Sequence, residues 1–421
     1  MKQKIFKTLA NLRFAIIILL IIAFISILGT IIEQDQNIEI YKSNYPLTNK
    51  LFGFLSWNII INLGLDHLYK TWWFISIIIT FGLSLLTCTL LQQIPAFRIA
   101  RRCQFFRTIT QFRQLKIYKK LKNIKLSRLF FKLKNTKYSI FQQKNIIYCY
   151  KGLIGRIAPI MVHFSMLIIL FGTLITSLVG FNGQEIVPKT ETFHIQNIFS
   201  NGKVTKFPNI STRINDFWII YRDRNVINQF YSNLSILNIN GEEITHKTIF
   251  VNSPVKYNGI DFYQTNWNLI GLRVQKNNNQ VIQYPLIDLD KNSNKTWLTW
   301  IPNTRELNDG IAILIDNLQG YCSIYNKSGK FLENFELNET AFLFSNYTLV
   351  DIINSDGLQI KTDPGIPIIY LGFFLLMLTT IISYKSYSQI WIVNNNSEIF
   401  IGGNTTRATF EFEFEFFKLF K

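Results

Sequence analysis

Cysteine and histidine are both scarce in this chain, and neither forms a recognisable motif. The cysteines make no CxxC pair and no CxxCH sequence, which excludes a thioredoxin-like redox protein and a protein that itself carries covalently attached haem. The HExxH, GxSxG and glycine-rich phosphate-binding patterns are absent as well. Because nothing argues for catalysis, we predict that the chain is not an enzyme. We expect free structural thiols at Cys88, Cys103, Cys149 and Cys322.

Charged residues are absent from four long apolar stretches, which cover residues 14–32, 71–94, 157–180 and 365–384. Each is long enough to cross about 30 Å of hydrocarbon as a helix, and a lipid bilayer admits only helices or closed barrels. We therefore predict a multi-pass α-helical membrane protein with four transmembrane helices. The first stretch is longer than a signal-peptide core, and no small-x-small cleavage site follows it. We expect it to remain as an anchor.

Acidic residues are missing between the second and third stretches. Residues 92–156 hold 17 lysines and arginines and no aspartate or glutamate, whereas residues 180–364 hold 16 basic and 18 acidic residues. The positive-inside rule places the basic segment on the cytoplasmic or stromal side. We expect it to lie on anionic lipid headgroups, with an anionic ligand or a protein partner as the alternative. The net charge of +18 is thus a topology signal and does not indicate nucleic-acid binding.

This orientation divides the rest of the chain between the two sides of a membrane. The inner segments are residues 1–13, 95–156 and 385–421, and the outer segments are residues 33–70 and 181–364. Only the last of these is large enough for a soluble core. The C-terminal sequence ATFEFEFEFFKLFK alternates Phe and Glu, which predicts a strand or a segment lying on a surface; we assign it no function.

The outer segment 181–364, between the third and fourth helices, is predicted to be β-rich. Short runs of alternating apolar residues are separated by turn dipeptides. These include Asn240-Gly241, Asn258-Gly259 and Asp356-Gly357. SILNIN followed by Gly241 is a clear hairpin signal. A β-sandwich or a β-meander would fit this pattern.

One imidazole interrupts the third apolar stretch. His163 lies seven residues after Arg156, which is about 10 Å along a helix. An ionisable side chain at that depth is expected to face a protein interior and to be functional, and imidazole is a common haem ligand. An interhelical hydrogen bond to Ser or Thr is the structural alternative. The residues alone leave both interpretations open.

A second histidine precedes the second apolar stretch. His67 lies just before Trp72 and Trp73, a tryptophan pair typical of a membrane interface. An exposed interfacial histidine without a ligand is the simpler interpretation, and haem ligation is the alternative. One histidine in the inner half of the membrane and one at its outer surface would suit a group that passes from inside to outside.

Four segments of the chain, in the same order, resemble the Ccs1/ResB family of system II cytochrome c biogenesis. They are LANLRFAIIILLIIAFISILGTIIEQ, WWFISIIITFGLSLLTCTLLQQIPAFR, VNSPVKYNGIDFYQTNW and TDPGIPIIYLGFFLLMLTTIISY. The resemblance implies a membrane assembly factor that works with a second protein, CcsA (ResC), to carry haem across the membrane. The pair would present reduced haem to the CxxCH sites of apocytochromes c, of the cytochrome f and c6 type.

The resemblance also implies residues and a location. The family's transmembrane histidine after the basic loop falls on His163, as a haem ligand or part of the haem path, and His67 matches a less general family position. The abundance of Ile, Asn, Lys and Phe resembles plastid-encoded members from algae. This implies the thylakoid membrane with the large domain in the lumen; the bacterial cytoplasmic membrane is the alternative.

The segment VNSPVKYNGIDFYQTNW offers two aromatic candidates for partner contact. It reads first as a well-packed hairpin with a turn at Asn258-Gly259. The alternative is a surface that meets CcsA or the apocytochrome, with Tyr263 and Trp267 as anchors. A different function also stays open, that of a membrane-tethered sensor or scaffold whose outer β domain binds a ligand.

Overall fold

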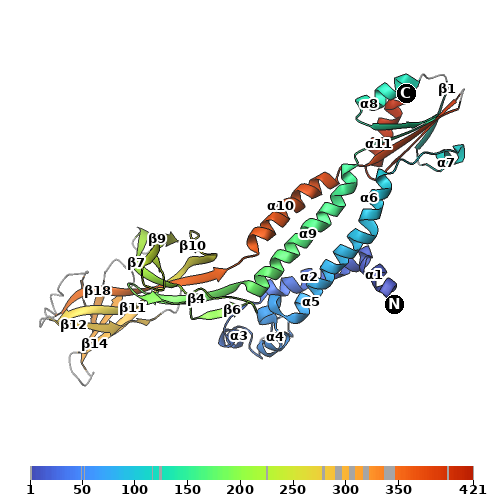
Figure 1. The fold of residues 1–421 in the computed structure, drawn as a ribbon. Helices are drawn as coiled ribbons and strands as arrows, with labels where there is room; N and C mark the ends of the chain where they lie inside the picture. The colour runs from blue at the N-terminus through green and yellow to red at the C-terminus, as the bar shows by residue number, and fades with distance from the viewer. Residues whose placement is uncertain are drawn as a thin grey trace. The chain divides into compact units, whose positions relative to one another are not determined.

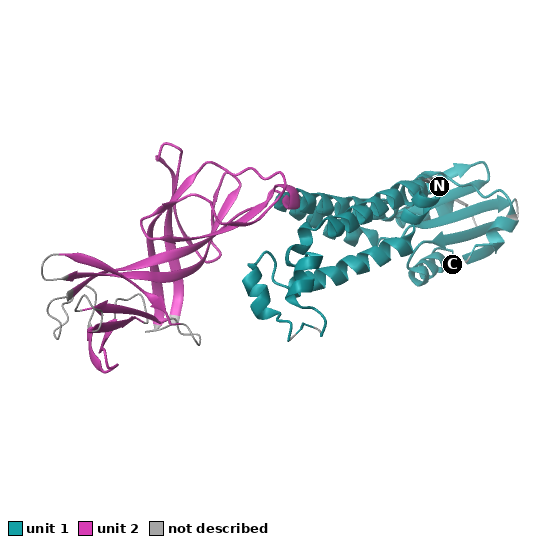
Figure 2. Cartoon of the chain, turned by 90° about the horizontal axis from the view of Figure 1, so that it is seen from below, with its two compact units in different colours: residues 1–175, 365–421 teal, residues 176–364 magenta. Residues whose placement is uncertain are grey.

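The chain forms two compact units (Figure 2). Unit 1 comprises residues 1–175 and 365–421, and unit 2 comprises residues 176–364. The structure is a computed structural model, and it describes residues 2–48, 50–51, 53–115, 117–122, 126–223, 226–276, 280–289, 296–302, 309–315, 322–335, 347–395 and 398–420.

Four helices in the described chain are long and apolar enough to cross a membrane. They are α2 (Leu12–Ile31), α5 with its continuation (Trp72–Arg101), α9 (Ile154–Val179) and α10 (Ile366–Ser383) (Figure 1). Each coincides with one of the predicted stretches. The second helix continues beyond its predicted end. The prediction stopped at residue 94 because the last turns of the helix are amphipathic and basic rather than apolar.

The second helix changes its winding near its inner end. α5 (Trp72–Cys88) passes into a π-helical turn, η2 (Thr89–Gln93), and then into α6 (Ile94–Arg101). Pro95 lies directly after the π turn and cannot donate the backbone hydrogen bond that a regular helix requires. The wider turn allows the helix to continue past this residue, and such turns are frequent at functional sites.

The long helices pack through apolar and small side chains. α2, α5 and α9 share a cluster around Ile18, Phe81 and Leu85. α9 and α10 approach closely at two glycines. A Cβ atom on Gly172 would lie 2.7 Å from Ile369, and one on Gly372 would lie 2.6 Å from the Ile169 side chain. Small residues at such positions let helix backbones come together in lipid.

The N-terminal residues of the chain lie beside the C-terminal end of α5. α1 (Lys2–Leu9) precedes α2. The hydroxyl of Ser84 donates to the Leu9 carbonyl at 2.7 Å, and the Gln92 amide donates to the Ala10 carbonyl at 2.6 Å. The start of the chain is therefore at the same end of the bundle as the basic segment.

The connection between α2 and α5 is a folded cap and not an open loop. It contains α3 (Ile38–Asn44), α4 (Trp57–Leu63) and the 3-10 helix η1 (Leu65–Lys70). Gln34 accepts a hydrogen bond from the Leu68 amide and donates to the carbonyl of Leu65. The small core of the cap consists of Ile32, Tyr41, Leu55, Ile60, Leu65 and Leu68.

The basic segment and the C-terminal tail form one antiparallel sheet, with the strand order β1-β20-β19-β3-β2. Its strands are β1 (Ile117–Lys122), β2 (Ser139–Gln143), β3 (Ile146–Lys151), β19 (Ser388–Asn395) and β20 (Glu398–Thr405). Figure 1 shows this sheet at the end of the bundle where α6 ends. The basic segment is thus a folded part of unit 1 rather than only a loop on lipid.

Helices cover both faces of this sheet. They are α7 (Ile109–Arg113), α8 (Leu126–Asn135) and α11 (Thr409–Leu419). α8 and α11 contribute to one apolar cluster, and Phe112 of α7 packs with Tyr148 and Trp391 in another. The C-terminal Phe/Glu segment is therefore a helix, not the strand that its alternation suggested.

Unit 2 is β-rich, as predicted, and its described residues form three antiparallel sheets. The central sheet contains β4 (Phe181–Pro188), β6 (Ile198–Asn201), β10 (Val255–Tyr257), β11 (Ile260–Lys276), β12 (Val281–Pro285) and β18 (Tyr347–Thr362). A second contains β5 (Thr192–Phe193), β7 (Ser211–Asp223), β8 (Val226–Leu237) and β9 (Glu243–Phe250). The third contains β13 (Ile287–Asp288), β14 (Trp297–Pro302), β15 (Gly310–Ile315), β16 (Cys322–Asn326) and β17 (Phe331–Phe335).

The two long strands β11 and β18 pair along most of their length and contribute to both apolar cores of unit 2. The predicted turns at Asn240-Gly241 and Asn258-Gly259 are present, with positive φ at both glycines. The predicted turn at Asp356-Gly357 is wrong, because β18 runs straight through it. Asp356 pairs with Trp267 of β11 and Val187 of β4 instead.

Candidate functional site

The imidazole of His163 lies between two of the long helices. It projects from α9, and its Nδ1 atom is 2.9 Å from the hydroxyl oxygen of Thr89. Thr89 is the first residue of the π turn that follows α5. The side chain of His163 is half-buried. The ring therefore has a protein partner at the depth where the sequence predicted a functional polar group.

The direction of this hydrogen bond determines which ring nitrogen is protonated. The Thr89 hydroxyl donates its single hydrogen to the Leu85 carbonyl at 2.7 Å. Toward His163 the hydroxyl can then only accept, so Nδ1 of the imidazole donates. This network assigns the tautomer of the neutral ring: the proton is on Nδ1 and the lone pair is on Nε2.

This arrangement is suited to binding iron. A metal-bound histidine typically donates its other ring N–H to a nearby acceptor, which orients the ring and fixes the tautomer. Thr89 supplies that acceptor for Nδ1, so Nε2 takes no part in this hydrogen bond. The surrounding side chains of α2, α5 and α9 are apolar. The structure confirms the interhelical hydrogen bond to a threonine, and haem ligation by His163 stays a prediction.

His67 lies at the opposite end of α5. It is part of η1, where its backbone leaves the helical region (φ −135°, ψ 44°). Its Nδ1 atom is 2.9 Å from Asp66 Oδ1, and its side chain is 48% exposed. α5 has 17 residues, or about 25 Å, between the two ends. The structure does not bring His67 and His163 into one site, so they cannot bind the same iron atom.

Only one of the two aromatic candidates on β11 has an accessible side chain. Trp267 is 6% exposed, and its ring lies 5.4 Å from that of Trp297 in the core of unit 2. It holds sheets together and offers no anchor to a partner. Tyr263 is half-buried beside charged groups. Lys361 lies 5.2 Å over its ring, and its hydroxyl donates to Asp261 at 3.4 Å.

Sequence reasoning missed a buried polar cluster in unit 2. Asp356 of β18 is fully buried and accepts hydrogen bonds from Ser232 of β8 and Gln264 of β11. Gln264 also donates to the Ser232 hydroxyl at 2.5 Å. Burial raises the pKa of Asp356 to about 6, although these hydrogen bonds and the Gly357 amide act in the opposite direction. Sequence reasoning missed this cluster because it assigned Asp356-Gly357 to an exposed turn.

The residues that the structure describes contain no group of three or more His, Cys, Asp or Glu side chains that could hold a metal ion. Any metal held at His163 would therefore bring most of its own ligands. Haem does so, because its porphyrin supplies four nitrogens and leaves only axial positions to a protein.

Comparisons with known proteins agree over nearly the entire chain. The model of the ResB-like family matches residues 12–321 and 318–417. The chain is 66% identical to the cytochrome c biogenesis protein Ccs1 of Thalassiosira pseudonana and 59% identical to that of Phaeodactylum tricornutum, in each case over the full length of both proteins. It is 42% identical to the cytochrome c biogenesis protein CcsB of a Nostoc species, over 99% of this chain and 91% of that protein.

Proposed function

Since this chain belongs to the ResB-like family, it acts in the biogenesis of c-type cytochromes, and we propose that it does so by holding haem at His163 on its way across a membrane. The resemblance noted in its four sequence segments is confirmed by these relatives. The single observation that carries the proposal is the contact between Nδ1 of His163 and the Thr89 hydroxyl, which leaves Nε2 available to iron.

His163 and its neighbours would have different roles in holding haem. His163 would hold the haem iron, and Thr89 would keep the imidazole ring in the required tautomer and orientation. The apolar cluster shared by α2, α5 and α9 begins about one helical turn from these two residues, at Leu85, Met166 and Leu167. When bound, haem supplies the reducible iron and the vinyl groups that react with cysteine thiols of an acceptor. The family's role is assembly, and we assign no covalent step to residues of this chain.

Haem transfer through His163 needs two other proteins, one that holds the haem together with this chain and one that accepts it. His163 would hold the iron from this chain, and His67 is too distant to hold the same iron. We propose that a CcsA-type partner would provide the second protein ligand. The chain contains no CxxCH sequence, so the acceptor of haem is another protein. Apocytochromes of the c type meet that requirement.

The sheet of unit 1 supports the proposed topology. Residues 117–151 and 388–405 pair in one sheet and so lie on one side of the membrane. α9 and α10 provide two crossings between these segments. The excess of Lys and Arg in residues 92–156 places that side in the stroma. Four crossings then put unit 2 in the lumen, and the diatom and cyanobacterial relatives support a thylakoid membrane.

We assign His67 to the outer end of the same path. It is exposed, it lies beside Asp66, and α5 separates it from His163 by about the thickness of a hydrocarbon core. A group that leaves His163 toward the lumen would therefore meet this second imidazole next. Tyr263 is the accessible aromatic on β11 that we assign to contact with a partner.

The experiment that tests the proposal compares three variants of the chain after co-purification with its CcsA-type partner. His163→Ala is expected to remove the Soret absorption that depends on this site. Thr89→Val keeps the imidazole but removes its acceptor, and should weaken haem binding about 10- to 100-fold. Thr80→Val is the matched control, because the Thr80 hydroxyl bonds only within α5, to Ser76. A His163→Ala complex with the haem content of the wild type would refute the proposal.

A further inference from the structure

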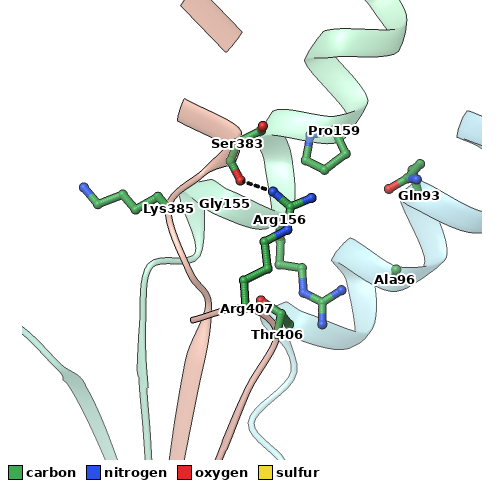
Figure 3. A pocket seen from close by; sticks show the side chains of 9 residues that line it. All are labelled: Gln93, Ala96, Gly155, Arg156, Pro159, Ser383, Lys385, Thr406 and Arg407. Atoms are coloured by element: carbon green, nitrogen blue, oxygen red, sulfur yellow. Dashed lines mark hydrogen bonds between the residues drawn. The ribbon is translucent and has the colours of Figure 1, made fainter. Parts of the chain in front are cut away.

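A small cavity lies at the inner end of the bundle, in unit 1 (Figure 3). It is bounded by the first turns of α9, the start of α6, the end of α10 and the segment after β20. Its volume is about 90 Å³. Its lining includes Gln93, Arg156, Pro159, Ser383, Thr406 and Arg407.

Two arginines make this cavity cationic. Figure 3 shows the guanidinium groups of Arg156 and Arg407 within it. Arg407 is oriented by a hydrogen bond from Nη1 to the Ser383 carbonyl, at 2.8 Å. The guanidinium of Arg156 lies 5.4 Å over the ring of Tyr387, and its buried Nε atom has no hydrogen-bond partner among the described residues.

No negative charge in the cavity balances these groups. None of the described residues that line it is an aspartate or glutamate. Two neighbouring guanidinium forks, one on the half-buried Arg156 and one on the exposed Arg407, favour an oxyanion such as a carboxylate or phosphate, to which arginine binds with paired hydrogen bonds. The cavity therefore has the charge and the donors of an oxyanion site.

The size of the cavity limits what can enter it. About 90 Å³ is room for roughly three water molecules. This accommodates one carboxylate or phosphate group but not a porphyrin ring or a nucleotide. The occupant must then be the charged end of a larger molecule whose remainder lies elsewhere, along the neighbouring helices.

The same two helices line the cavity and hold the histidine site. Arg156 and His163 are seven residues apart on α9, which places them on one face of the helix, about 10 Å apart along its axis. Gln93 and Thr89 are four residues apart across the π turn of the other helix. An acidic group tethered to a ligand of His163 would thus have the cavity within reach, toward the stromal side.

We infer that this cavity binds the carboxylate of a haem propionate and so fixes which edge of the haem faces the stroma. The inference rests on the proposed function, in which haem is held at His163. It assigns Arg156 and Arg407 to the carboxylate and leaves the iron to His163.

The test compares haem with haem dimethyl ester, in which both propionates are uncharged. Soret titrations use the full chain in complex with its CcsA-type partner, in nanodiscs of neutral phosphatidylcholine, with empty nanodiscs subtracted. The wild type is expected to bind haem at least about tenfold more tightly than the ester, as for a hydrogen bond to a charged group. Arg156→Gln and Arg407→Gln should each bring this ratio toward one without moving the Soret maximum.

Lys385→Gln is the matched control, because it removes a charge at the same place while the Lys385 side chain points away from the cavity (Figure 3). It should leave the ratio unchanged. Arg407→Gln protects the test if Arg156→Gln fails to fold, since Arg156 also packs on Tyr387.

The other possible results show whether the propionate site or the haem site at His163 is wrong. Equal binding of haem and ester by the wild type, or a ratio that survives both arginine substitutions, overturns the propionate site but not the haem site. Loss of the preference in nanodiscs with phosphatidylglycerol would mean that a lipid phosphate occupies the cavity, and also overturns it. If neither haem nor ester binds to the wild type, or if His163→Ala binds both normally, the proposed function itself fails.

Discussion

The hydroxyl of Thr89 determines which nitrogen of the His163 ring carries the proton. A serine or threonine that lies within a helix usually turns its hydroxyl to a carbonyl of the preceding turn, and Thr89 does so with Leu85. Having used its hydrogen there, the hydroxyl presents only lone pairs to the imidazole. A single residue thereby sets the proton on Nδ1 of His163 and leaves Nε2 as a base.

At the same scale, Asp356 gives unit 2 a dependence on pH. Its pKa is raised from its ordinary value of 3.8 to about 6 by burial among Ser232, Gln264 and the core of unit 2. Between those values the folded chain retains a proton that the unfolded chain has lost. The stability that Asp356 contributes is therefore fully present below about pH 4 and is lost as the pH rises through 6.

We predict that Asp356→Asn flattens this profile. The wild type should lose up to about 3 kcal/mol of stability in unit 2 between pH 4 and pH 7, and the variant should lose much less. Hydrogen–deuterium exchange of β8, β11 and β18 in the intact chain, corrected for intrinsic exchange rates, measures this. Equal pH dependence in both proteins would show that another group is responsible.

The C-terminal Phe/Glu segment forms a helix although its alternating sequence is typical of a strand. Alternation with a period of two predicts a strand, but both edges of β20 are already occupied by β1 and β19. As a helix, the segment places Phe412, Phe416 and Leu419 on one face, where all three are buried. Gly403 makes room for that face, since a Cβ atom there would lie 2.7 Å from the Phe412 ring.

We predict that Phe416→Ala destabilises the sheet of unit 1 by about 3–5 kcal/mol, because Phe416 is fully buried. Phe414→Ala is the control on the same helix. Its ring is 69% exposed, so the effect should be within about 0.5 kcal/mol. Exchange protection of β19 and β20 in the intact chain is the readout. Similar losses in both variants would contradict the helical packing of α11.

Local composition explains which elements the sequence could predict. The four apolar helices follow from runs without charge, and His163 was identifiable because it breaks one of them. The π turn and the contact with Thr89 depend on how Pro95 and two distant helices fit together, which no single segment records. For the same reason the sheet that joins residues 117–151 to 388–405 could not be predicted, and the partner role of Trp267 gave way to its packing on Trp297.

For the whole molecule, the central proposal is a topology in which residues 117–151 and 388–405 face the stroma and residues 181–364 face the lumen. The charge asymmetry of the chain and the pairing of the first two segments in one sheet both favour this orientation. In the proposed orientation, Arg156 would lie near the stromal surface, His163 deeper in the bilayer and His67 at the lumenal surface.

Cysteine labelling in sealed thylakoid vesicles checks this topology. Cys103 is exposed, whereas Cys88, Cys149 and Cys322 are buried and should stay silent. A membrane-impermeant maleimide is expected to label Cys103 directly from the stromal side. A cysteine introduced as Asn240→Cys, at an exposed turn of unit 2, should react only after the vesicles are opened. Labelling of both sites in sealed vesicles would contradict the proposed orientation.

The most direct test of the account replaces His163 with glycine and supplies imidazole from solution. The complex of His163→Gly with its CcsA-type partner should lack the Soret band of this site, and millimolar imidazole should restore both the band and the maturation of c-type cytochromes. The rescue should fail in His163→Phe, whose ring fills the same space. A His163→Gly complex that binds haem fully without imidazole would show that the iron is held elsewhere.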